Sequence, residues 1–274
     1  MPRKLRFLPA KCLLMAFALI YFAPILLIAC GSVMPEGQLQ ALFGSLSLWG
    51  LIPSPVTLKG YDQLLIAQTA YLKTFWNSAL LCAVIVAGQC ALSAAVSFAI
   101  WRRCLPGGRL VLAVCAFVML LPFQVTMLPN YIQIRRLGLY NTLWALILPG
   151  VFSPLGVFLT YQFMKDMPPE IVEAALMDTS SPARILLYIV TPNVAQALGA
   201  LALITFAENW NLVEQPLIFI KDAWKYPLSL TLSQAEGEMN GIFAGAVVYM
   251  LPIYFLFRMF GDSLLDGLER IGTR

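Results

Sequence analysis

Four polar side chains interrupt one of the apolar runs of this 274-residue chain and carry groups that can bind a polyol. They lie within "ALITFAENWNLVEQPLIF", at steps of three, three and four residues: Thr205, Glu208, Asn211 and Gln215. This spacing places them on one face of a predicted helix. Their donors and acceptors match sugar hydroxyls, and the neighbouring Trp210 suits the apolar side of a pyranose ring. We interpret this face as a candidate translocation-path and solute-binding surface.

The composition places that helix and its neighbours in a membrane. Apolar residues make up 60% of the chain, charged residues 12%, and the mean hydropathy is +0.79. In soluble domains, apolar residues make up about 45–50% of the chain and charged residues about 25%. A helix that crosses a bilayer needs about 20 apolar residues. Six runs are long enough: 12–33, 76–101, 110–134, 140–164, 194–220 and 240–260.

Glu208 is informative in that setting. A carboxylate at the centre of a bilayer costs about 2.5–3.5 kcal/mol on insertion scales, so we expect Glu208 to face a cavity or a protein partner. The alternative is that the polar face hydrogen-bonds to a neighbouring helix. The two interpretations are compatible if the neighbouring helix belongs to a second subunit that lines the same path.

Prolines break two of the runs, Pro122 and Pro129 the third, and Pro149 and Pro154 the fourth. Such breaks are tolerated in a membrane where protein or a water-filled cavity surrounds them, which favours a path through the protein. Ordinary kinked packing is the alternative, because proline is common in membrane helices.

Several motifs of enzymes are absent from the sequence. The chain contains no histidine, which excludes histidine metal ligands and Ser-His-Asp triads, and no GxxxxGK[ST] nucleotide loop. Its six cysteines show no CxxC pairing. "LIACG", ending at Gly31, resembles a lipoprotein cleavage site, but the preceding apolar run is long for a signal peptide, and we expect an uncleaved first helix. The sequence therefore predicts a non-enzyme driven by a partner or by an ion gradient.

The basic residues predict the orientation, since cytoplasmic loops collect Lys and Arg. Twelve of the 18 fall on the side of the N-terminus: Arg3, Lys4, Arg6, Lys11, Arg102, Arg103, Arg109, Lys165, Arg184, Arg258, Arg270 and Arg274. Both termini, and the loop between the fourth and fifth runs, are predicted to be cytoplasmic.

That loop, "DMPPEIVEAALMDTSSPARILLYIVTP" from Asp166 to Pro192, predicts two short helices. Pro168 and Pro169 suit a first helical turn, where a missing N–H costs nothing, and acidic residues follow at the positive end of the helix dipole. The pair Ala174 and Ala175 presents a face with little side chain, which lets another surface approach closely. Ser181 can cap a second helix that Pro182 starts. We expect the first helix to dock on another protein.

The same stretch is similar to the EAA signature of the membrane-spanning subunits of binding-protein-dependent ABC importers. The matching residues are Glu173, Ala174, Ala175, Asp178 and Pro192. Flanking segments such as "LGLYNTLWALILPG" and "ENWNLVEQPLIF" resemble the carbohydrate branch, of maltose or glycerol-phosphate type, over about residues 58–260. Thr179 stands where the family has glycine, and "GLERIGTR" only loosely matches the usual C-terminal end.

The resemblance implies an all-α membrane protein with six transmembrane helices and a cytoplasmic coupling helix, the type I ABC importer permease fold. It implies the inner membrane of a bacterial or archaeal cell, a heterodimer with a second permease, two ATPases, and an extracytoplasmic solute-binding protein. The five signature residues would couple to the ATPases. ATP and Mg would act on those partners, this chain would need no cofactor, and alternating access would import a sugar or sugar derivative.

The expected organisation is a first helix with an extracytoplasmic segment (1–57), a five-helix permease core (58–264) that contains the signature loop 166–192, and a cytoplasmic tail (265–274). Three alternatives stay open: the same importer class for a non-sugar solute, a secondary transporter, and a membrane scaffold. A secondary transporter predicts inverted repeats, which the chain does not display.

Overall fold

The computed structural model describes residues 8–45, 48–67 and 69–272, is 79% helical, and has no strand in these ranges. Arg3, Lys4, Arg6 and Arg274, which enter the charge count, lie outside the described residues. The all-helical prediction is therefore confirmed for the part of the chain that is described.

The six predicted apolar runs all coincide with helices. Four stretches are long and apolar enough to cross a membrane: Leu13–Gly31, Thr69–Trp101, Trp144–Lys165 and Met239–Met259. Two further helix pairs pass the same test only together, and they bend by 109° and 81°: Gly108–Val118 with Phe123–Arg136, and Pro182–Asn193 with Ala195–Trp210. The described residues thus provide four spans, or six if each bent pair is one span, on length and composition.

The chain divides into two compact units, and the first combines residues 1–72 with 234–252. Its helices are α1 (Leu8–Gly31), α2 (Glu36–Ser45), η2 (Leu48–Leu51), α3 (Lys59–Asp62), η3 (Gln63–Ala67) and the first part of α15 (Met239–Gly272). Met34, Leu39 and Leu42 form its buried cluster. Glu36 accepts a hydrogen bond from the backbone N–H of Asn240 (3.1 Å), which ties α2 to the start of α15.

Glu36 lies outside the apolar spans, and its environment shifts its acidity. Burial by itself would raise the pKa of this carboxyl. Hydrogen bonds from the backbone of Asn240 and Met239 and from the Gln40 side chain, together with the charge of Lys59, outweigh burial and lower the pKa below its usual value. The carboxylate therefore stabilises this unit in its ionised form.

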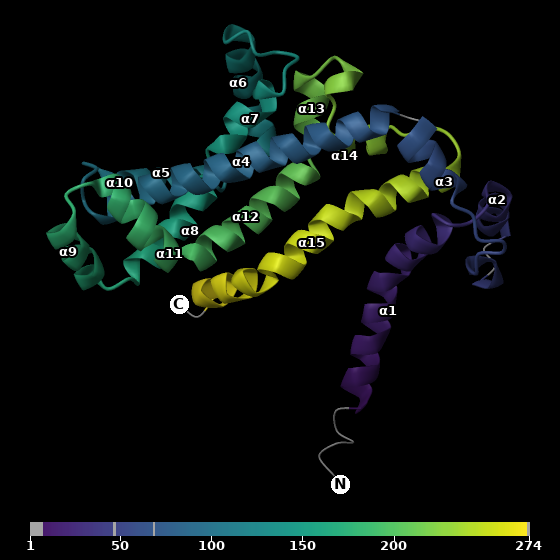
Figure 1. Ribbon diagram of the computed structural model, residues 1–274, viewed down its shortest axis with the longest axis horizontal. Helices are drawn as coiled ribbons and strands as arrows, with labels where there is room; N and C mark the ends of the chain where they lie inside the picture. The colour runs from purple at the N-terminus through teal and green to yellow at the C-terminus, as the bar shows by residue number, and fades with distance from the viewer. Residues whose placement is uncertain (1–7, 46–47, 68, 273–274) are drawn as a thin grey trace. The chain divides into compact units, whose positions relative to one another are not determined.

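The second unit combines residues 73–233 with 253–274 and contains the predicted signature loop. Its helices are α4 (Thr69–Trp101), α5 (Gly108–Val118), α6 (Phe123–Arg136), α7 (Trp144–Val151), α8 (Pro154–Lys165), α9 (Pro169–Asp178), α10 (Pro182–Ile185), η4 (Leu186–Val190), α11 (Thr191–Asn193), α12 (Ala195–Trp210), α13 (Glu214–Phe219), η5 (Ala223–Lys225), α14 (Leu228–Ser233) and the last part of α15. Within this unit α9 and α10 lie toward the C-terminal end of α4 (Figure 1).

The main core of the second unit joins α4, α8, α9, η4 and α12. Its buried members are Phe98, Leu159, Phe163, Met164, Met167, Val172, Ala175, Ile185, Val190, Val194, Ala197, Ala200 and Leu201. This core reaches from the membrane helices into α9, so the signature helix packs on its own chain. The expected domain boundaries after residues 57 and 264 stay a prediction.

Candidate functional site

The predicted signature helix is α9, which begins at Pro169 with Pro168 at its N-cap and Glu170 in its first turn. The predicted start is confirmed, because proline fits where the helix has no N–H to pair. The second helix begins at Pro182 after Ser181, also as predicted. The predicted cap is wrong in its chemistry, since the Ser181 side chain makes no capping hydrogen bond.

The two alanines of the signature point in different directions. Ala175 is 9% exposed and, with Val172, belongs to the core of the second unit. Ala174 is exposed, one residue earlier on the helix. The interpretation of both as one open face is therefore wrong, because residues one step apart on a helix lie about 100° apart. Only Ala174 can receive an approaching surface.

Met177 belongs to the outward face of α9, and the sequence analysis did not select it. Its side chain is 88% exposed, although methionine is apolar. Glu173 is exposed beside it. The helical period was the available signal. At about 100° per residue, Met177 is rotated about the helix axis by about 140° from Val172 and by about 200° from Ala175, so it faces away from both. Met177 thus adds an exposed apolar side chain to the outer face of α9.

α9 ends at Asp178, which is exposed, and the turn that follows needs no glycine. Thr179 has φ −153° and ψ 134°, an extended conformation open to any residue. Its hydroxyl accepts a hydrogen bond from the backbone N–H of Ser181 (3.3 Å). The chain therefore accommodates threonine at the position of the family glycine. Pro192, the last signature residue, is exposed in α11, close to the bend that leads into α12.

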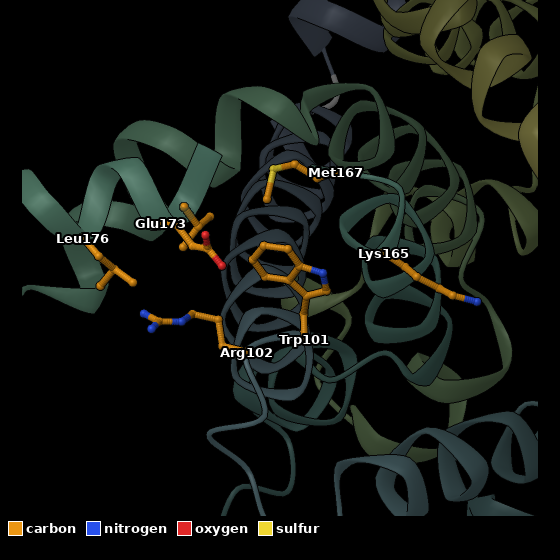
Figure 2. Close-up of a pocket in the computed structure, with 7 residues that line it drawn as sticks. Trp101, Arg102, Lys165, Met167, Glu173 and Leu176 are labelled. Atoms are coloured by element: carbon orange, nitrogen blue, oxygen red, sulfur yellow. The ribbon is translucent and has the colours of Figure 1, made fainter. Parts of the chain in front are cut away.

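A groove of about 400 Å³ separates α9 from the ends of two membrane helices. Trp101 and Arg102 at the end of α4, and Lys165 at the end of α8, line it together with Glu173 of α9. Figure 2 shows Glu173 and Leu176 on one side of the groove and Trp101 and Arg102 on the other. No ion pair joins these charges in the described part of the chain, where the pairs are Lys59–Glu238 and Lys225–Asp222.

The predicted polar face on the fifth span is divided by a break in the helix. α12 ends at Trp210 and α13 begins at Glu214, so the interpretation of a continuous helical face is wrong. Pro216 explains the break, since it lacks the N–H that would bond to the Leu212 carbonyl. The Ser229 hydroxyl donates to that carbonyl instead. This proline was a signal in the sequence that the analysis did not use.

The predicted path residues therefore occupy separate environments. Thr205 is 1% exposed, and its hydroxyl donates to Gln89 Oε1 (2.6 Å). Glu208 is exposed on α12, whereas Gln215 is half-buried on α13. Asn211 is exposed, and its Nδ2 donates back to the Ala207 carbonyl (2.7 Å). Glu208 is thus the predicted path residue on α12 that offers a charged group to a solute or a partner.

Trp210 has no open face for a sugar in this structure. It is 1% exposed, and Phe206 stacks on it with ring centroids 5.2 Å apart and an interplanar angle of 16°. Phe75 contacts it edge-on at 5.6 Å. The interpretation of Trp210 as an accessible stacking surface is therefore wrong here: the ring is part of the packing between α4 and α12.

Gln89 on α4 connects three helices and was also missed by the sequence analysis. Its Nε2 donates to the Gly150 carbonyl (2.6 Å), and its Oε1 accepts from Thr205 (2.6 Å). In a continuous helix that carbonyl would bond to the N–H of residue 154, which is a proline. Gln89 therefore satisfies the group that the break between α7 and α8 leaves free. On the same face of α4, Ser97 donates to the Val157 carbonyl (2.8 Å).

The described residues hold no group of three or more Cys, Asp or Glu side chains arranged to bind a metal ion. What the geometry offers is a helix with an exposed outer face, a groove behind it, and a polar network where prolines break the membrane helices.

Comparisons with known proteins place these features in a family. A scan against protein-family models finds no match. The sn-glycerol-3-phosphate transport system permease protein UgpE of Shigella flexneri is 30% identical over 208 residues, 71% of this chain and 73% of that protein. The arabinooligosaccharides transport system permease protein AraQ of Halalkalibacterium halodurans is 27% identical over 226 residues, 81% of each chain.

The fold also matches a solved structure. A chain in the crystal structure of a bacterial ABC transporter involved in the import of the acidic polysaccharide alginate aligns with a TM-score of 0.84. The alignment covers 96% of this chain and 98% of that chain, at 18% sequence identity. The two chains share their fold.

Proposed function

Because this chain belongs to the permease subunits of carbohydrate ABC importers, we propose that it is the six-helix permease of an ATP-driven importer for a sugar or sugar derivative. Each bent helix pair would count as one span. The substrates named for the relatives, arabinooligosaccharides and sn-glycerol-3-phosphate, support this solute class. The relatives are transport permeases, not enzymes, so ATP hydrolysis would occur on partner ATPases that bind ATP and Mg.

The working assembly would contain a second permease, two ATPases and an extracytoplasmic solute-binding protein. Both termini and α9 would lie in the cytoplasm, in agreement with the distribution of basic residues. Closure of the ATPases would carry α9 with them, and the spans would open outward to receive the solute.

The exposure pattern of α9 carries the coupling proposal. Val172 and Ala175 fix the helix to the core that also holds α8 and α12, while Glu173, Ala174 and Met177 remain outside. A force applied to the outer face is therefore transmitted to the membrane helices through buried side chains, because a packed core deforms little. One short helix offers far less than the roughly 1,200 Å² of a stable interface, so other contacts must share the affinity.

A size series at Ala174 tests this role. Ala174→Trp should prevent close approach of the ATPase and lower ATP hydrolysis stimulated by the binding protein about tenfold, equivalent to about 1.4 kcal/mol. Ala174→Ser is the matched control and should retain activity. Glu173→Lys should also lower stimulated hydrolysis by weakening a charge-assisted contact.

The measurements are stimulated hydrolysis and sugar uptake in reconstituted vesicles, together with the amount of assembled subunit. Ala175→Trp is unsuitable for this purpose, because Ala175 lies in the core and the added volume would strain folding. Wild-type rates in an Ala174→Trp/Glu173→Lys variant would refute the coupling role. So would a loss of activity that only follows the loss of folded subunit.

Topology is tested with Cys104, which is free and exposed in the loop between α4 and α5. In a variant that keeps only this cysteine, an impermeant thiol reagent applied to whole cells should leave it unlabelled until the membrane is permeabilised. A cysteine placed at Lys221, on the proposed extracytoplasmic side, should label at once. The opposite pattern would invert the proposed orientation.

Glu208 tests the solute path. Glu208→Gln keeps the size and removes the charge, and Glu208→Leu removes both charge and polarity. We expect uptake to fall in that order of severity while the complex still assembles. Normal uptake by both variants would place Glu208 away from the path.

A further inference from the structure

The groove between α9 and the ends of α4 and α8 is lined by basic side chains beside apolar ones. Two cations line it. Arg102 is the first residue after α4, and Lys165 is the last residue of α8. Neither forms an ion pair within the described residues, where Glu173 is the acid that lines the groove. The Arg102 guanidinium carbon lies 5.8 Å from the centroid of the Phe98 ring, which holds the charge at the groove without neutralising it.

The depth of the groove relative to the membrane follows from the helices that end there. α4 is an apolar span that ends at Trp101, and the span formed by α7 and α8 ends at Lys165. Tryptophan concentrates at the boundary between hydrocarbon and water, and the groove therefore opens at the level of the lipid head groups. Met167, Val172 and Leu176 supply an apolar lining beside the charges.

Together these features fit a lipid. Basic pockets between membrane helices on the cytoplasmic side bind the phosphates of anionic head groups. Arginine can hold a phosphate with two parallel N–H groups, so Arg102 would make the direct contact. Lys165 extends away from the Arg102 guanidinium (Figure 2) and would add a point charge at the rim of the groove. The apolar lining suits the upper part of an acyl chain. A charge balance of two cations against one carboxylate selects an anionic lipid over a neutral one.

We propose that the groove lined by Trp101, Arg102 and Lys165 binds the head group of an anionic phospholipid. The proposal rests on the orientation given under Proposed function, which places this end of α4 at the cytoplasmic leaflet. A bound lipid would fill the space between the membrane helices and the Glu173 side of α9. It would thereby fix the position from which the coupling helix engages its partner.

The test uses the complete transporter complex in nanodiscs of phosphatidylcholine with phosphatidylglycerol. The lipid that stays bound after exchange into detergent is measured by native mass spectrometry. Two basic residues near an anionic surface contribute about 1 kcal/mol each, which corresponds to roughly thirtyfold preference for phosphatidylglycerol. Arg102→Gln/Lys165→Gln should abolish that preference.

The matched control is Arg103→Gln/Arg109→Gln, which removes the same charge from neighbouring positions that do not line the groove. It should retain the preference, and Arg102→Lys, which keeps the charge, should retain most of it. Equal thermal midpoints of the variants establish that folding is intact.

Three results would overturn the proposal: no preference in the wild type, an unchanged preference in the groove variant, or an equal loss in the control. If the groove variant releases the ATPases but keeps the lipid, the groove holds a protein segment instead. Because lipid retention is measured without turnover, a negative result leaves the coupling role of α9 untouched. A failed coupling test equally leaves lipid binding untouched.

Discussion

Gln89 should stabilise the break between α7 and α8, and Gln89→Leu removes both of its hydrogen bonds at nearly constant volume. The variant leaves the Gly150 carbonyl and the Thr205 hydroxyl without the partner that each has at 2.6 Å. An unpaired buried polar group costs about 1–3 kcal/mol in soluble proteins. Hydrogen bonds between membrane helices average nearer 0.6 kcal/mol, because the unfolded chain in the membrane also finds partners. We therefore expect a loss of about 1–3 kcal/mol in the free energy of unfolding.

Thr205→Val separates the two bonds. It removes only the hydroxyl and should cost about 1 kcal/mol or less. In the double variant the loss should be smaller than the sum, because the two side chains share one hydrogen bond. Gln133→Leu is the control: Gln133 is exposed on α6, and its replacement should change stability by no more than about 0.5 kcal/mol.

The assay is reversible unfolding of the purified subunit or complex in mixed detergent and denaturing detergent, monitored by fluorescence. If Gln89→Leu is as stable as the wild type and the double variant shows simple additivity, the Gly150 carbonyl must have another partner. The reasoning about the proline break would then be refuted. A loss equal to that of Gln133→Leu would lead to the same conclusion.

Two further predictions concern the first unit. Gly60→Ala should destabilise it strongly, because an added Cβ would lie 2.5 Å from the Asn240 carbonyl oxygen. Gly37→Ala, in α2 with nothing within 4 Å, should be neutral or stabilising in the same thermal unfolding measurement. The pKa of Glu36 is lowered in the folded protein from its usual value of 4.5. The ionised carboxylate therefore adds fully to the free energy of unfolding above pH 4.5, and this stabilisation is lost as the pH falls below that value. Glu36→Gln should remove this part of the acid sensitivity, and an unchanged pH profile would contradict the assignment.

The sequence by itself determined the class of the protein and the local starts of its helices. Apolar content depends on composition, so the runs that cross the membrane were readable without tertiary contacts. The start of α9 at Pro169 was equally local, since proline restricts its own backbone and lacks an N–H. The similarity around Glu173 identified the family for the same reason: it depends on the order of residues.

Only the tertiary structure decided which side of α9 is buried and which side is exposed. Ala174 and Ala175 are identical in chemistry, and only the position of the core makes one inward and the other outward. Trp210 is a suitable ring for a sugar in isolation, yet Phe206 occupies its face.

The contacts that satisfy broken helices also come from distant parts of the chain. Gln89 reaches Gly150 across 61 positions. The groove likewise exists only because the fold brings the ends of α4 and α8 beside α9. A proline in the sequence reveals that a carbonyl is free, but the residue that pairs with it is set by the packing of helices that are far apart in the sequence.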